Sequence, residues 1–261
     1  QQTGFIKGRS MSQNIVEIES LALSFAATPA VKRATMVFFD FSAAFPSVAH
    51  EWIFFVLSRM NIPVEFVDLI YNLYLGCKSQ ISIGKKRMDE IHVNSGIKQG
   101  CPLSGTIFAI VMDPLLRMLI ATPYTWRVEF RAYADDIAAV LEDTDVDLQL
   151  VLSRFGIIRR ASSLTLKPSK VAVVPLNPSV GINEHRDRIL ATVPEMKDAS
   201  FKFAARYLGA MVGPLAHISR WAKPAATIVT RARWIRGQAG ICASRAIRAY
   251  CTHAVSTSTF H

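Results

Sequence analysis

The 261-residue sequence has few cysteines, no internal repeat and no low-complexity segment. Its four cysteines contain no C-x-x-C pair, which argues against a disulfide framework and a structural zinc site. Such cysteine usage favours a reducing, intracellular compartment. We expect neither a secretory signal nor a membrane-spanning helix, because the longest uncharged stretches fall short of about 18 apolar residues. At 51% apolar residues the chain is too hydrophobic for a disordered tail, so a sizeable buried core is predicted.

Acidic residues are absent from the C-terminal part of the chain after Asp198. Residues 201–261 carry nine Lys and Arg residues, whereas residues 1–200 carry 21 basic and 20 acidic residues. The formal net charge of +10 therefore comes almost entirely from the C-terminal segment. A polyanionic partner would explain this asymmetry, since Lys and Arg placed along phosphates release counterions. A basic face that is simply solvated is the alternative.

Hydrophobic patterning predicts alternating strands and helices, in a mixed α and β class with hairpins as well as crossovers. Strands are expected at 35–41, 79–84, 88–93, 127–133, 137–141 and 164–176, the last interrupted by a proline at 168. Helices are expected at 49–60, 64–75, 103–120, 145–161 and 221–254, with a loop rich in Pro and Gly before the last.

Acidic residues end or join the predicted strands at two places. Asp40 closes an apolar strand, and Asp135-Asp136 forms a turn between two others. Each is unremarkable alone, as acids are common in turns. If the strands are neighbours, three carboxylates converge and repel one another unless a cation neutralises them. Oxygen ligands of this kind suit Mg²⁺, and two such ions about 3.5–4 Å apart catalyse in-line phosphoryl transfer.

Five segments follow the order of the palm motifs A to E of reverse transcriptases: VFFDFSAAFPSV at 37–48, SGIKQGCPLSGTIF at 95–108, AYADD at 132–136, LTLKPSK at 164–170 and RYLG at 206–209. The chain resembles the reverse transcriptase domain of non-LTR, LINE-type retroelements. The opening QTGFIKGRSMSQNI resembles the segment before motif A in those elements. The resemblance begins after the basic finger motifs, which implies an N-terminally truncated domain.

The resemblance implies an α+β fold: a right-hand polymerase palm, with a ferredoxin-like antiparallel sheet backed by helices, partial fingers and the start of a helical thumb. The implied division is a fingers remnant at 1–34, palm with motif A at 35–60, and a fingers-side helix and hairpin at 61–95. Palm with motifs B, C and D follows at 96–205, and a primer grip with thumb-like basic helices at 206–261.

The implied activity is RNA-templated DNA synthesis, in which a nucleotide passes from a dNTP to a primer 3′-hydroxyl. Asp40, Asp135 and the backbone carbonyl of Phe41 would hold two Mg²⁺ ions, for which Mn²⁺ could substitute. Asp136 would lie beside them, and Lys170 would protonate the departing pyrophosphate. The implied partners are an RNA template, a DNA primer and dNTP, without a membrane. A retroelement protein would act inside the cell, on chromosomal DNA in the nucleus.

Further positions carry implied binding roles. Phe45 would lie under the sugar of the incoming nucleotide and exclude a 2′-hydroxyl, while Phe41, Gln99 and Gly100 would complete the dNTP site. Implied contacts to primer and template are Arg9, Tyr133, Tyr207, Leu208, Gly209, Arg231, Arg233 and Arg236. Two alternatives stay open: a catalytically dead retroelement remnant that only binds nucleic acid, and a fragment of a group II intron-type maturase.

Overall fold

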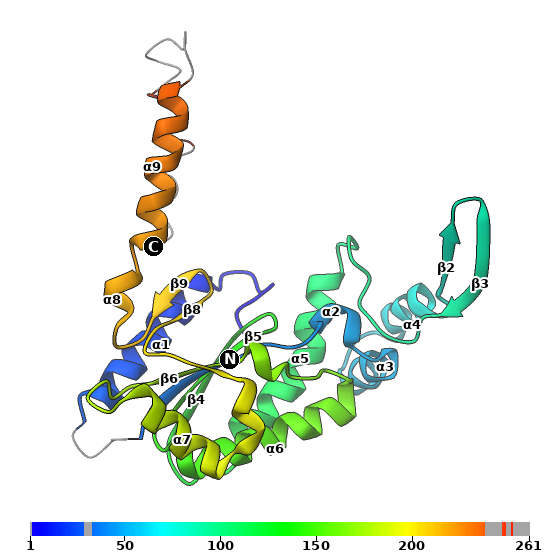
Figure 1. Ribbon diagram of the computed structural model, residues 1–261. Helices are drawn as coiled ribbons and strands as arrows, with labels where there is room; N and C mark the ends of the chain where they lie inside the picture. Colours follow the sequence, from blue (N-terminus) through cyan, green and yellow to red (C-terminus); the bar gives the residue numbers. More distant parts are fainter. Residues whose placement is uncertain (1, 29–32, 238–246, 249–251, 253–261) are drawn as a thin grey trace.

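A five-stranded sheet forms the centre of the molecule in a computed structural model that describes residues 2–28, 33–237, 247–248 and 252 (Figure 1). Its spatial order is β4-β5-β1-β6-β7. Neighbouring strands are antiparallel except for the β6–β7 pair. The strands are β1 Thr35–Phe39, β4 Val128–Tyr133, β5 Asp136–Leu141, β6 Ala172–Pro175 and β7 Ser200–Phe201. The predicted α+β class with a largely antiparallel sheet is confirmed.

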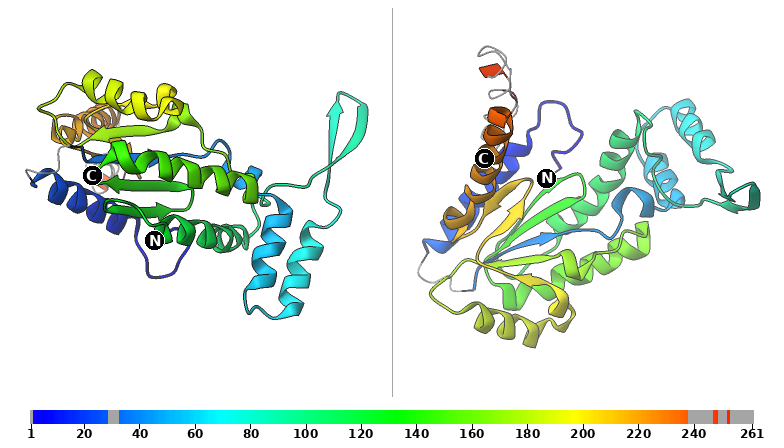
Figure 2. Two further views of the ribbon diagram at one scale, coloured as in Figure 1. Left: turned by 90° about the horizontal axis from the view of Figure 1, so that it is seen from below. Right: turned by 45° about the horizontal axis from the view of Figure 1, so that its top comes forward.

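The central strand β1 is buried on both faces, which explains its uninterrupted apolar sequence TMVFF. Val37 and Phe39 face a core shared with helices α5 (Ser104–Ala121) and α6 (Thr144–Ser162). Met36 and Phe38 face a second core, which contains α1 (Met11–Ala26) and the hairpin of β8 (Ala205–Tyr207) and β9 (Ala210–Val212). Helices therefore cover both faces of the sheet (Figure 2).

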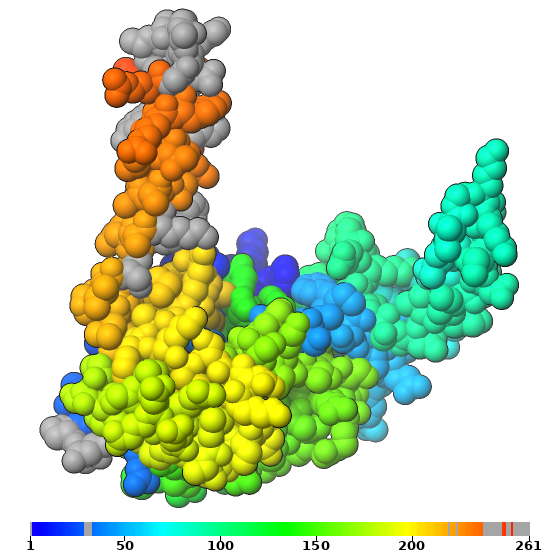
Figure 3. Space-filling model, in the orientation of Figure 1, coloured from blue at the N-terminus to red at the C-terminus, as the bar shows by residue number. Residues whose placement is uncertain are grey.

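Two elements project from this body. The hairpin of β2 (Lys78–Ile83) and β3 (Lys86–His92) is exposed along both strands, and it follows α2 (Ala44–Ser47), α3 (His50–Arg59) and α4 (Val64–Tyr74). The second projection is α9 (Ala222–Gly237), preceded by the short α8 (Ala216–Ser219). Figure 3 shows both rising on the same side of the body, with a broad open face between them.

The predicted strand at 164–176 is wrong in length. Proline has no backbone N–H to donate to a ladder, and residues Pro168–Lys170 form a 3₁₀ turn, η1, instead. Only Ala172–Pro175 remains as β6, although Leu166 still bridges to Phe41. Because η1 interrupts the strand, Lys170 lies outside the sheet and close to the end of β1.

The segment predicted as a Pro- and Gly-rich loop is largely ordered secondary structure. It contains α7 (Ile182–Thr192), the 3₁₀ turn η2 (Pro194–Asp198), β7, β8, β9 and α8. His185 and Ile189, four residues apart, are the buried residues of α7, a spacing that local pattern could have revealed. Of the helix predicted at 221–254, α9 accounts for 222–237, and most of the remainder lies outside the described residues.

Within the described ranges, α5 alone is long and apolar enough to cross a membrane by length and composition. Asp113 and Arg117 interrupt its apolar sequence, so α5 does not stand out as an uncharged stretch. Eight of its residues are buried, and they belong to the first core apart from the N-terminal Ser104. Packing inside the protein therefore accounts for the apolar character of α5.

Candidate active site

Strand register brings Asp40 next to the acidic turn. Phe39 pairs with Ile137 in the antiparallel β1–β5 ladder. Continuing that register by one residue places Asp40 opposite Asp136, the first residue of β5. The Nζ of Lys170 lies 3.1 Å from Oδ1 of Asp40, and both side chains retain solvent contact. Two of the predicted acids and the predicted lysine therefore meet at one end of the sheet.

The third carboxylate belongs to the two-residue turn Ala134-Asp135, which joins β4 to β5 after the pair Tyr133–Asp136. Ala134 has φ +54°, in the left-handed region, where turns commonly use glycine. An L-residue with a Cβ pays about 1–2 kcal/mol for this conformation. Other contacts must therefore hold Ala134 in place, and with it the direction of Asp135.

The environment of the acidic turn disfavours the charged forms of Asp135 and Asp136. Burial, with repulsion from Asp135 and then Asp40, raises the pKa of Asp136 to about 6, although its side chain still reaches solvent. Burial is also the largest cause of the raised pKa of Asp135, followed among the raising influences by the charge of Asp40. Lys170 acts in the opposite direction on both groups. The site thus holds more negative charge than its own lysine neutralises.

This donor set fits a hard divalent cation. Among the described residues, no three His, Cys, Asp or Glu side chains are grouped as metal ligands, so side chains alone do not complete a site. A backbone oxygen is available: Ser42 N donates to Thr165 O at 2.9 Å and Lys167 N to Asp40 O at 3.0 Å. These bonds make Phe41–Leu166 a non-hydrogen-bonded pair, which leaves the Phe41 carbonyl out of the ladder.

The β8–β9 hairpin borders the carboxylates. Asp40, Asp136 and Lys170 line a small cavity of about 90 Å³ together with Arg206, Tyr207 and Leu208. The hairpin tip has Leu208 at φ +46° and Gly209 at φ +92°. Tyr207 is buried and stacks on Phe38 at 5.0 Å between ring centroids, and burial raises the pKa of its hydroxyl. Stacking of Tyr207 on Phe38 therefore anchors the hairpin to β1, and Leu208 of the tip lines the cavity.

Phe45 is part of a three-ring cluster. Its ring stacks on Phe108 of α5, with centroids 4.2 Å apart and planes at 9°, and Phe5 approaches it edge-on at 6.0 Å. Phe5 lies so close over Gly105 that a Cβ on that glycine would be 2.7 Å from Cδ1 of Phe5. The half-buried Phe45 is therefore held in one orientation by a helix and by the N-terminal segment.

The loop before α5 exposes Gln99 and Gly100 to solvent, and Gly100 has φ +83°. Two residues that the sequence did not single out anchor this loop. His50 Nε2 hydrogen-bonds the carbonyl of Gly96 at 3.0 Å, and the Tyr74 hydroxyl accepts the Lys98 N–H at 3.3 Å. Neither residue belongs to a sequence motif, so their contacts with this loop become visible only in the folded structure.

Arg9 binds the protein itself: its Nη1 donates to the carbonyl of Gln2. Arg9 also lines a groove of about 900 Å³ along α5, with Phe5 and Lys7. Tyr133 is half-buried at the end of β4, beside the acidic turn. Arg231, Arg233 and Arg236 lie exposed on α9, away from the sheet (Figure 1).

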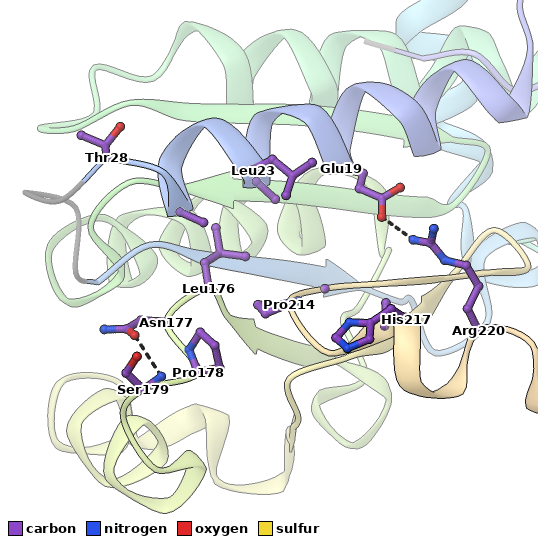
Figure 4. Close-up of a pocket in the computed structure, with 14 residues that line it drawn as sticks. Glu19, Leu23, Thr28, Leu176, Asn177, Pro178, Ser179, Pro214, His217 and Arg220 are labelled. Carbon is purple, nitrogen blue, oxygen red and sulfur yellow. Dashed lines mark hydrogen bonds and ion pairs between the residues drawn. The ribbon is translucent and has the colours of Figure 1, made fainter.

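A separate hollow of about 650 Å³ lies between α1, the β6–α7 connection and the β9–α8 segment (Figure 4). Glu19 and Arg220 form an ion pair at its edge, and Leu23, Leu176 and Pro214 supply apolar walls. None of the three site carboxylates lines it. Asp40 and Asp136 line the smaller cavity beside the β8–β9 hairpin instead.

A sequence model of the reverse transcriptase (RNA-dependent DNA polymerase) family matches residues 1–210. The chain belongs to the reverse transcriptase family. This match covers the chain from the N-terminal segment through β8 and ends at the first residue of β9. The acids that converge in the structure lie within the matched residues, and their assignment to motifs A and C stays a prediction from the sequence resemblance.

The curated relatives of this reverse transcriptase come from non-LTR retrotransposons, which confirms the predicted type. It is 28% identical over 224 residues to a Pol polyprotein from the type-1 retrotransposable element R2 of Popillia japonica, covering 78% of this chain and 34% of that protein. It is 26% identical over 216 residues to a transposon TX1 149 kDa protein of Xenopus laevis, covering 80% and 16%. The chain spans about a third or less of these relatives.

Solved structures of telomerase share the fold. Apo telomerase from Candida tropicalis matches with a TM-score of 0.61 at 9% identity, over 98% of this chain and 41% of that one. A form truncated from the C-terminal domain matches with a TM-score of 0.57 at 11% identity, over 82% and 40%. The predicted polymerase fold is confirmed, whereas the division into fingers, palm and thumb at particular residues stays a prediction.

Proposed function

We propose that this reverse transcriptase domain extends a DNA primer on an RNA template by two-metal nucleotidyl transfer from dNTP. The observation that carries the proposal is the convergence of Asp40, Asp135 and Asp136 at one end of the sheet, where burial and the charge of Asp40 raise the pKa of Asp135 and of Asp136. Family membership supports RNA-templated DNA synthesis in general. The carboxylate and carbonyl oxygens of the site, which suit Mg²⁺, support the two-metal mechanism.

Asp40, Asp135 and the Phe41 carbonyl would hold the ions. Bound there, two Mg²⁺ ions would activate the primer 3′-hydroxyl and stabilise the pyrophosphate leaving group. Lys170 stands at the same place, with its ammonium on Asp40 Oδ1. We propose that Lys170 donates the proton that the leaving pyrophosphate takes up. Its flexible side chain would let the ammonium group move from the Asp40 carboxylate to a nearby phosphate.

Phe45 supplies sugar selection in this proposal. Its ring is pinned between Phe108 and Phe5, so it has little freedom to move aside for a 2′-hydroxyl. Gln99 and Gly100 lie on the exposed loop that opens α5 and would approach the nucleotide from there. The β8–β9 hairpin would hold the primer terminus against the carboxylates, whose cavity it borders.

Primer and template would lie across the open face between the two projections (Figure 3). Arg233 and Arg236 on α9 are exposed on one side, and Lys85 and Lys86 at the tip of the β2–β3 hairpin on the other. Cations at both margins suit a duplex bound by its phosphates rather than by its bases. The template RNA and the DNA primer are thus proposed partners, as is dNTP.

The test is primer extension with dTTP on poly(rA)/oligo(dT) in Mg²⁺, for the wild-type chain and the Asp40→Asn variant. We expect Asp40→Asn to lose at least about a thousandfold in extension rate, because losing a carboxylate ligand weakens the metal site and removes several kcal/mol of transition-state stabilisation. Its melting temperature should change little, because the lost ion pair with Lys170 and the relieved repulsion of Asp135 and Asp136 act in opposite directions. Asp187→Asn, on the exposed surface of α7, is the matched control.

Extension by Asp40→Asn near the wild-type rate would overturn the catalytic assignment. If the wild-type chain binds the hybrid duplex but extends no primer, this chain acts as a non-catalytic nucleic-acid-binding domain instead.

A further inference from the structure

The N-terminal segment reaches the acidic turn from more than a hundred residues away in sequence. Gln2 is 5% exposed, and its carboxamide bonds both backbone polar groups of Ala134. Its Nε2 donates to the Ala134 carbonyl at 3.0 Å, and its Oε1 accepts the Ala134 N–H at 2.8 Å. Ala134 is the residue with φ +54° that directly precedes Asp135.

Other residues of the N-terminal segment allow its close approach to Ala134. Oε1 of Gln2 also accepts the N–H of Gly4 at 2.8 Å, which folds the segment around its own side chain. A Cβ on Gly4 would lie 2.4 Å from the Ala134 nitrogen, so a larger residue there would force the segment off the turn. The guanidinium of Arg9 donates to the Gln2 carbonyl and so also holds the Gln2 backbone.

Two further side chains tie down the strand that enters the turn. The carbonyl of Ala132 accepts hydrogen bonds from Thr3 N at 2.9 Å, Thr3 Oγ1 at 3.1 Å and Asn14 Nδ2 at 2.9 Å. Ala132 is fully buried, so these bonds are shielded from water. Residues 2–14 therefore hold the backbone on the β4 side of the carboxylates in addition to the β4–β5 ladder.

We infer that Gln2 is a positioning residue for the acidic pair: its carboxamide holds Ala134 in the left-handed conformation and so sets the direction of Asp135. The inference rests on the proposed function only where it concerns catalysis. Gln2 touches neither reacting atoms nor phosphate in this assignment; it acts through Ala134. A glutamine fits this role because one planar side chain offers a donor and an acceptor at the spacing of a peptide group.

The test uses the whole chain with Gln2→Met and Gln2→Glu. Gln2→Met keeps the side-chain length and removes both hydrogen bonds, whereas Gln2→Glu keeps the acceptor for the Ala134 N–H and removes the donor to its carbonyl. Gln80→Met is the matched control, because the exposed Gln80 on β2 also donates to a backbone carbonyl, that of Met88. Melting temperatures are measured for every variant.

Three readouts follow. For Gln2→Met, exchange of the Ala134 amide hydrogen should become at least about tenfold faster, because exchange reports local opening. Mn²⁺ affinity, followed by electron paramagnetic resonance, should weaken severalfold. The kcat for dTTP should fall about 10- to 100-fold with KM nearly unchanged, as expected for a displacement of about 1 Å at reacting groups. Gln2→Glu should keep Ala134 protected and regain part of kcat.

A protected Ala134 amide in Gln2→Met, together with wild-type Mn²⁺ affinity and kcat, would overturn the inference. So would a loss of kcat that Gln80→Met shares or that merely follows a loss of folded protein. If wild-type protein extends no primer, the proposed function fails, and amide exchange with Mn²⁺ binding still decides the role of Gln2.

Discussion

Replacing Asp136 with Asn should stabilise the folded domain above pH 6 and weaken the dependence of its stability on pH. Burial, with repulsion from Asp135 and Asp40, raises the pKa of Asp136 from 3.8 to about 6. Between these two values the folded state binds more protons than the unfolded state. The linkage relation then makes the free energy of unfolding fall as pH rises through this window. At neutral pH the Asp136 carboxylate is therefore a destabilising group.

The size of the effect follows from the same numbers. A rise in pKa from 3.8 to about 6 corresponds to about 3 kcal/mol at about 1.36 kcal/mol per pH unit. Asp136 reaches solvent, which screens its interactions, so about 1 kcal/mol is the expected gain. For a domain of this size, 1 kcal/mol raises the melting temperature by about 2–4 °C.

Urea unfolding at pH 5 and pH 8, in EDTA, measures this difference for wild type and Asp136→Asn. Asp187→Asn on α7 controls for the loss of one surface charge. Adding Mg²⁺ at pH 8 should narrow the gap between wild type and Asp136→Asn, because a bound cation relieves the same repulsion. The reasoning is refuted if Asp136→Asn is no more stable than wild type at pH 8, or if both proteins lose stability equally between the two pH values.

Three further outcomes are expected. Phe45→Ala should raise rNTP incorporation relative to dNTP, and Gly105→Ala should do so more weakly by displacing Phe5; single-nucleotide extension with each triphosphate measures both. Asp147→Ala should cost about 3 kcal/mol in urea unfolding, because the buried carboxylate accepts the N–H groups of Thr125 and Trp126 at 2.9 and 2.8 Å. The double variant Arg233→Ala/Arg236→Ala should reduce the salt slope of duplex binding by about two, and an unchanged slope would remove α9 from the interface.

Local pattern was enough to find the elements that carry the acids. An apolar run at 35–41 must be buried on two faces, and the polar break at Asp40 marks its end. Two strand-like segments separated only by Ala134-Asp135 predict a β-hairpin, which the structure contains. The N-terminal segment shows where this reasoning stops, since α1 and the contacts of Gln2 with Ala134 involve pairings that no local pattern contains.

By itself, the sequence determined the class of fold, the motifs and the identity of the acids, because strand period, turn chemistry and residue type are local properties. Tertiary structure alone decided that β5 lies between β4 and β1, so that Asp40 stands opposite Asp136 and the pKa of Asp136 rises. It also decided that Pro168 bends Lys170 onto Asp40 and that Gln2 holds Ala134. These are contacts between segments that are distant in sequence, so they form and contribute energy only in the folded protein.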